Sequence, residues 1–183
     1  NAEFFETDIK KMLNINLLSM AVSSDSSVTT RASGFSVVDL DDDGTSEVVL
    51  WLVVNGNDNY GSMVLRYQDG VVYGYVMWYR SFNQLKADGT FHFSSSAGNS
   101  GIGKLTFDKE TYSIFKVAYR EANYGTDGNP IISYIVNNET ATKEEFDAVY
   151  NKQDEKPDTV WYDFTDDNIE KVFSGLATGT WKE

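Results

Sequence analysis

The chain has 183 residues, 41% of them hydrophobic and 14% aromatic, which is enough to bury one sizeable core, so we expect a single domain spanning 1–183. Its 28 acidic and 15 basic residues give a formal charge of -13, which repels phosphate backbones and anionic membranes, so nucleic acid is not an expected partner. The absence of cysteine excludes disulfides and thiolate metal sites, and no apolar run approaches the roughly 18 residues of a transmembrane segment.

The first twenty residues predict a helix with one apolar face. The side chains near helical spacing are Phe5, Ile9, Met12, Leu13 and Leu17. The opening stretch NAEFFETDIKK belongs to this helix and does not have the pattern of a signal peptide, so we expect any targeting segment to have been removed. Residues 23–34 form a small polar connector, after which the apolar period changes to the alternation of strands.

Acidic side chains crowd into the stretch FSVVDLDDDGTSEVVLWLVV, residues 35–54. Carboxylates at alternate positions of a tight turn converge on one point, and a glycine after the third permits the sharp bend. The expected ligands of one calcium ion are Asp39, Asp41, Asp43, Glu47 and the carbonyl of Thr45. Only oxygen atoms are offered, which suits a hard cation of flexible geometry better than the strict octahedron of magnesium.

This pattern covers the first nine positions of an EF-hand loop and departs from it at the twelfth, where Leu50 replaces the bidentate glutamate. The flanking runs SVV and EVVLWLVV are β-branched, so we expect strands to hold the loop and the ion to be structural. Asp42 lies between the ligands and is expected to point to solvent. The alternative is a solvated acidic loop without an ion.

Several strand pairs are predicted beyond the loop. Asp69-Gly70 joins two alternating runs and is the strongest hairpin signal, because this dipeptide tolerates the positive φ angles of a tight turn. Asp88-Gly89 repeats it more weakly, and another turn is expected at 108–110. IISYIV, residues 131–136, predicts a further strand.

The end of the chain returns to helical patterns. Thr142 and Glu145 have the spacing of a capping box, and a second short helix is expected to start at Thr165 and to end before Gly175. The expected buried stripes are Phe146, Val149 and Tyr150 on the first helix and Ile169, Val172 and Phe173 on the second. The predicted fold class is α+β: an N-terminal helix, an antiparallel meander with a strand-flanked calcium loop, and one or two C-terminal helices.

Aromatic side chains on both faces of the hairpin at 62–79 are candidates for ligand binding, because an antiparallel sheet often buries only one face. They are Tyr67, Tyr73, Tyr75, Tyr79 and Trp78. The alternative is that they pack in the core. His92, the single histidine, alternates with Phe91 and Phe93, so we expect a surface side chain without a catalytic role.

The acidic loop resembles the strand-flanked calcium loops of the FG-GAP repeats in integrins and the DxDxDG loops of many exported bacterial proteins. A wider likeness includes "DLDDDGTSEVVL", "LRYQDGVVYGYVMWYRSF", "LKADGTF" and "TKEEFDAVYNK". In this order the segments resemble uncharacterised secreted proteins and lipoproteins of Gram-positive bacteria. The resemblance implies a secreted or lipid-anchored location at a bacterial surface. It implies no activity and no catalytic residues.

The function that we expect is that of an extracytoplasmic, calcium-stabilised binding domain whose partner is an extracellular glycan, peptide or protein. Two other functions stay open: a calcium-dependent hydrolase of extracellular polymers, and a structural or assembly domain of a surface complex. An enzyme is expected to show a cleft with convergent polar groups, and a binding domain an exposed aromatic patch without them.

Overall fold

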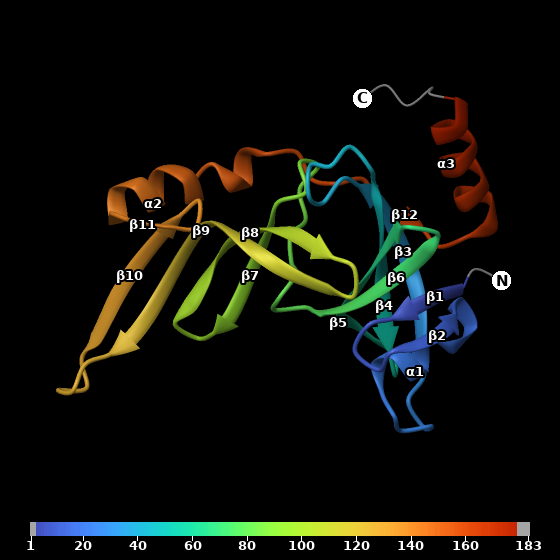
Figure 1. Cartoon of the computed structure of the whole chain (residues 1–183), viewed down its shortest axis with the longest axis horizontal. Helices are drawn as coiled ribbons and strands as arrows, with labels where there is room; N and C mark the ends of the chain where they lie inside the picture. Colours follow the sequence, from blue (N-terminus) through green and yellow to red (C-terminus); the bar gives the residue numbers. More distant parts are fainter. Residues whose placement is uncertain (1–2, 179–183) are drawn as a thin grey trace.

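The computed structural model describes residues 3–178, and two sheets of largely antiparallel strands dominate it (Figure 1). The larger sheet comprises β1 (Glu3–Glu6), β2 (Lys11–Asn14), β3 (Thr30–Val38), β4 (Glu47–Val54), β5 (Asn57–Gln68), β6 (Val71–Trp78) and β12 (Tyr162–Asp163), in the spatial order β12-β3-β4-β5-β6-β1-β2. The smaller sheet comprises β7 (Phe91–Ser96), β8 (Asn99–Asp108), β9 (Thr111–Tyr124), β10 (Pro130–Val136) and β11 (Glu139–Ala141), in the order β11-β10-β9-β8-β7.

Three α-helices accompany the sheets in the described part of the chain: α1 (Leu18–Val22), α2 (Lys143–Tyr150) and α3 (Asp166–Thr178). Two 3-10 turns, η1 (Ile15–Leu17) and η2 (Gln153–Glu155), precede α1 and follow α2. The mixture of helices and antiparallel sheets fits the predicted α+β class only loosely, because strands account for most of the structure. Within residues 3–178, no helix has the length and apolar character needed to cross a membrane.

The main core lies between the two sheets. Val49, Val64 and Tyr75 of the larger sheet meet Phe91 and Leu105 of the smaller one, all at most 1% exposed. Alternation along β4 to β6 sends the intervening side chains to the opposite face, where a second core forms. There Leu50 and Met63 pack in one cluster with Val172 of α3, while α2 covers the smaller sheet through Phe146 (Figure 1).

The predicted hairpins are present. Asp69 and Gly70 have φ angles of 52° and 87°, and Gln68 pairs with Val71 across this turn. Asp108 pairs with Thr111 at the turn between β8 and β9. The Asp88-Gly89 turn is closed by a 2.8 Å bond from the amide of Lys86 to the carbonyl of Thr90, but it leads into an isolated bridge rather than a long strand pair.

The prediction of an N-terminal helix is wrong, because residues 3–14 form a hairpin of β1 and β2. Phe5 of β1 pairs in parallel with Tyr73 of β6, so a distant strand edge satisfies the backbone groups that a helix would have bonded internally. The carboxylate of Glu6 accepts the amide of Ile9 at 2.7 Å and stabilises the intervening turn. In the apolar stripe that predicted the helix, Leu13 is buried, whereas Ile9 and Met12 are exposed at 40% and 54%.

The two C-terminal helices are confirmed, with one difference in what they bury. Thr142 and Glu145 form the predicted capping box, with bonds of 3.2 Å and 2.8 Å. Phe146 of α2 is 7% exposed, as expected. On α3, Phe173 is 48% exposed rather than buried, and the helix continues past Gly175 to Thr178. The buried side of α3 is therefore narrower than its sequence pattern indicated.

Candidate metal and ligand sites

The acidic loop joins β3 to β4 at an end of the larger sheet, so two paired strands fix both of its ends, as predicted. Gly44 has a φ of 84°, which confirms the sharp bend. Inside the bend, the amide of Gly44 donates to Asp39 Oδ2 at 2.9 Å and the amide of Thr45 donates to Asp43 Oδ1 at 2.7 Å. These bonds within the loop orient the carboxylates of Asp39 and Asp43 without the help of an ion.

Three of the predicted ligands converge. Asp39, Asp41 and Asp43 each offer an oxygen within 4.8 Å of the others, a spacing from which a metal ion could be held. Within this cluster, Asp39 Oδ1 and Asp41 Oδ1 are buried and have no hydrogen-bond partner among residues 3–178. Buried carboxylate oxygens without partners are costly, so this cluster has unused capacity to bind a positive group.

Glu47 lies at the base of the loop and is only 1% exposed. Its Oε2 accepts the amide of Leu40 at 2.9 Å. Burial raises the pKa of Glu47 to about 7, an effect that the Leu40 bond and Arg66 only partly oppose. A raised carboxyl pKa is typical of a general acid, but a side chain this buried cannot reach a substrate, so we assign Glu47 a structural role.

The sequence did not reveal that Arg66 of β5 belongs to this cluster. Its guanidinium forms ion pairs with Asp41, with Asp43 at 2.8 Å and with Glu47 at 3.6 Å, and it lies 4.6 Å from the centre of the Phe107 ring. Its side chain is 11% exposed, so these interactions are weakly screened. Arg66 is thus a cation built into the acidic loop.

Asp42 lies outside the cluster, as predicted. It points away with a side chain that is 73% exposed, and it pairs with Lys104 of β8. This contact joins the acidic loop to the smaller sheet.

The aromatic side chains predicted to bind a ligand do not gather into one surface. Tyr75 is 1% exposed in the main core, and Tyr73 packs against that core. Tyr67 pairs with Val72, so it lies on the opposite face of the sheet from Tyr73 and Tyr75. Tyr67 is 65% exposed at one end of the hairpin, while Trp78 is 53% exposed at the other.

Tyr79 follows β6 and is 54% exposed, whereas the neighbouring Trp78 packs at a tilt of 53° against Tyr60, with ring centres 4.7 Å apart. Because the five side chains divide between the core and separate exposed positions, they are not one binding surface.

His92 is more buried than we expected. Its side chain is 17% exposed, and its ring packs edge-on against Tyr150 of α2 at 5.4 Å. Burial lowers the pKa of His92, although Asp154, 3.7 Å from Nε2, opposes this. The backbone of His92 forms a bridge with Asn83, which fixes the segment between the two sheets.

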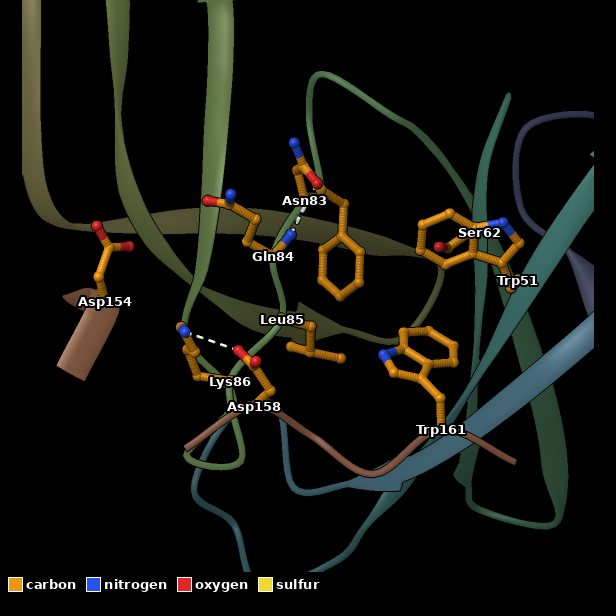
Figure 2. Close-up of a pocket in the computed structure, with 10 residues that line it drawn as sticks. Trp51, Ser62, Asn83, Gln84, Leu85, Lys86, Asp154, Asp158 and Trp161 are labelled. Carbon is orange, nitrogen blue, oxygen red and sulfur yellow. Dashed lines mark hydrogen bonds and ion pairs between the residues drawn. The ribbon is translucent and has the colours of Figure 1, made fainter. Parts of the chain in front are cut away.

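A cavity of about 430 Å³ opens beside that segment (Figure 2). Its lining residues are Trp51, Ser62, Phe82, Asn83, Gln84, Leu85, Lys86, Asp154, Asp158 and Trp161. Trp51 of β4 and Trp161, just before β12, meet edge to face with ring centres 5.4 Å apart. No local pattern could have revealed this pair, because 110 positions separate the two tryptophans.

Comparisons of the chain with protein-family models, curated proteins and solved structures found no match. The acidic loop and the tryptophan-walled cavity are therefore the basis for inferring function.

Proposed function

We propose that the chain is an extracytoplasmic binding domain whose acidic loop holds one structural calcium ion. The charge balance of the loop supports the ion. Asp39, Asp41, Asp43 and Glu47 are four carboxylates, and Arg66 supplies one positive charge, so their full ionisation leaves three negative charges uncompensated. Arg66 pairs with Asp41, Asp43 and Glu47, but Asp39 has no ion pair among residues 3–178.

The observation that carries the metal proposal is the pair of buried oxygens, Asp39 Oδ1 and Asp41 Oδ1, that lack partners in the described chain. A divalent ion with oxygen ligands would satisfy both and would offset the remaining charge. Glu47 would contribute a ligand oxygen from the base of the loop. The Thr45 carbonyl and water would complete the coordination shell of the ion. Because a twelfth-position glutamate is missing, we expect a dissociation constant on the order of 10⁻⁵ to 10⁻³ M.

Such an affinity fits a compartment with plentiful calcium, which agrees with the secreted or surface-anchored location that the sequence resemblance implies. The ion must stabilise the fold if it binds only the native state, by about 2.7 kcal/mol at a hundredfold excess over the dissociation constant. Thermal melts in calcium and in chelator test this directly. Magnesium at the same concentration is expected to give a smaller rise in Tm.

Asp39→Asn provides the sharpest variant, because Asp39 does not contact Arg66 and an amide oxygen can still accept the Gly44 amide. We expect it to remove most of the calcium-dependent rise in Tm. Asp42→Asn is the matched control, since Asp42 is exposed and pairs with Lys104 outside the cluster. An equal response in wild type and Asp39→Asn, or no calcium uptake by calorimetry at millimolar concentration, contradicts the metal assignment.

The binding part of the proposal is supported by the cavity of Figure 2, which combines two aromatic walls with polar groups at its rim. A cavity of this size and mixed lining is typical of a site for a small molecule or one unit of a polymer. Screening the purified chain on glycan and peptide arrays tests the binding function. Binding on either array that is lost when residues lining the cavity are substituted supports the binding function. An absence of hits on both contradicts it.

A further inference from the structure

The two tryptophans of the cavity form a fixed aromatic corner. Trp51 is anchored because its indole nitrogen donates to the carbonyl of Asp58 at 2.6 Å. Trp161 stands at 90° to it and remains 37% exposed. Both rings also line a neighbouring hollow of about 300 Å³ beside Gly34 and Tyr162. The tryptophan pair is therefore a ridge between two hollows, with room for a ligand that extends across it.

The wall of the cavity is held by backbone bonds to distant segments. Asn83 exchanges both of its backbone bonds with His92, Leu85 accepts the amide of Thr159 at 3.2 Å, and the amide of Lys86 donates to Thr90. Gln84, between these anchors, has a φ of 50°, a conformation that costs energy for a residue with a side chain. Such strain persists where the surroundings fix it, and it often marks a binding site.

These bonds limit how a ligand can be recognised. The amides of Asn83, Gln84 and Lys86 already donate within the chain, so these three amides are not available to an added peptide strand. Recognition must come from side chains and from ring surfaces.

Lys86, the one cation among the lining residues, is already paired, whereas the exposed carboxylate of Asp154 has only His92 Nε2 beside it among residues 3–178, at 3.7 Å. Lys86 Nζ lies 2.7 Å from Asp158 Oδ1, and the lysine side chain is only 8% exposed. No net positive charge is left for an anion in a chain of formal charge -13. A cation is not favoured either, because the two rings contact each other and do not surround a space, as the faces of an aromatic cage do.

Apart from the Asp154 carboxylate, whose side chain is 86% exposed, the uncommitted polar groups include two neutral donors. In Figure 2 the indole nitrogen of Trp161 points into the cavity toward Leu85, and it has no hydrogen-bond partner among residues 3–178. The side chain of Asn83 accepts the Gln84 amide at 2.9 Å through its oxygen, which leaves its amide nitrogen free to donate. Neutral donors beside flat apolar rings match a ligand with hydroxyl oxygens and an apolar C–H face.

We propose that the cavity binds a neutral oligosaccharide, with one sugar ring stacked on Trp161 and a neighbouring ring across the ridge in the second hollow. This proposal rests on the binding function above and names its ligand class. The apolar face of one pyranose covers the Trp161 ring, and the in-plane N–H of Trp161 donates to a hydroxyl of the adjoining sugar, with the Asn83 amide as a second donor. The ligand would therefore extend from the cavity to the second hollow, across the tryptophan pair that lines both.

The test begins with an array of neutral oligosaccharides of glucose, mannose, galactose and N-acetylglucosamine, beside acidic oligosaccharides and unmodified peptides. Hits among the neutral oligosaccharides are then measured by titration calorimetry. We expect Trp161→Ala to weaken binding about tenfold or more, since interface tryptophans contribute most to affinity. Trp161→Phe, which keeps an aromatic ring but loses the N–H donor, is expected to fall between wild type and Trp161→Ala.

Trp78→Ala is the matched control, because Trp78 is another exposed tryptophan and lies outside the cavity. It should bind the same oligosaccharide with unchanged affinity. If Trp161→Ala does not fold by its melting curve, Trp161→Phe and Asn83→Ala are compared with Trp78→Ala instead. Equal affinity in the cavity variants and the control overturns the proposal, as do hits confined to acidic oligosaccharides. Hits confined to peptides overturn the saccharide but leave the binding function intact.

Discussion

Burial of Glu47 predicts an unusual dependence of stability on pH. The ordinary pKa of 4.5 applies to the unfolded chain, whereas in the fold the pKa is about 7. The folded state therefore disfavours the ionised form, so stability is fully present below about pH 4.5 and is lost as pH rises through 7. At about 1.4 kcal/mol per pKa unit, the total cost is about 3.5 kcal/mol, of which about 2.5 kcal/mol falls between pH 5 and pH 8.

The variant Glu47→Gln isolates this effect, because an amide oxygen can still accept the Leu40 amide but cannot ionise. Urea unfolding in calcium-free buffer should show that wild type loses about 2 to 3 kcal/mol more than Glu47→Gln between pH 5 and pH 8. Comparing the two chains cancels the contributions of Glu6, whose pKa is also raised by burial, and of His92, whose pKa is lowered. Parallel pH profiles for wild type and Glu47→Gln would refute the reasoning.

Three further variants test other parts of the structure. Arg66→Met leaves the carboxylates without their built-in cation. In chelator we therefore expect urea unfolding to show a free energy of unfolding lower by about 3 kcal/mol or more. Added calcium should restore much of this loss. Gly74→Ala places a Cβ 2.6 Å from the Phe4 ring, so Tm should fall and hydrogen exchange should accelerate in β1, whereas an unchanged exchange pattern would contradict this packing. Phe146→Ala should lower the free energy of unfolding by about 3 kcal/mol, because the ring is only 7% exposed. Phe173 is 48% exposed, so Phe173→Ala should change the free energy of unfolding by less than about 0.5 kcal/mol, and equal effects of the two variants in urea unfolding would contradict their burial.

Local chemistry made several features predictable from the sequence. Asp69-Gly70 and Gly44 adopt the positive φ angles that their turns require, and three aspartates at alternate positions converge as their spacing indicated. The capping box of Thr142 and Glu145 is equally local. In each case the decisive residues lie within a few positions of one another, so the surrounding fold did not have to be known.

Features that depend on distant strands were missed or mispredicted. Arg66 reaches Glu47 because the β4–β5 register shifts between Leu52 and Val54, where a bulge moves each partner by two positions. A regular hairpin would place Val64 opposite Glu47 instead. The N-terminal helix failed for a similar reason, since the partner of Phe5 is Tyr73 in β6. Helical spacing describes only the segment itself and not the strand edge that is available to it.

The same topology has a consequence for the order of folding. Strands β3 to β6 are neighbours in both sequence and space, but the two flanks of the larger sheet are closed by distant segments: Phe5 pairs with Tyr73, and Tyr162 pairs with Phe35. Closing long loops is entropically unfavourable until the central strands exist to receive them. On a chain made from its N-terminus, β1 must wait for β6 to emerge, and β12 is the last strand that the larger sheet receives. We therefore expect the central meander to form the kinetic nucleus, with the acidic loop inside it and the tryptophan ridge, which needs Trp161, completed only in the final steps.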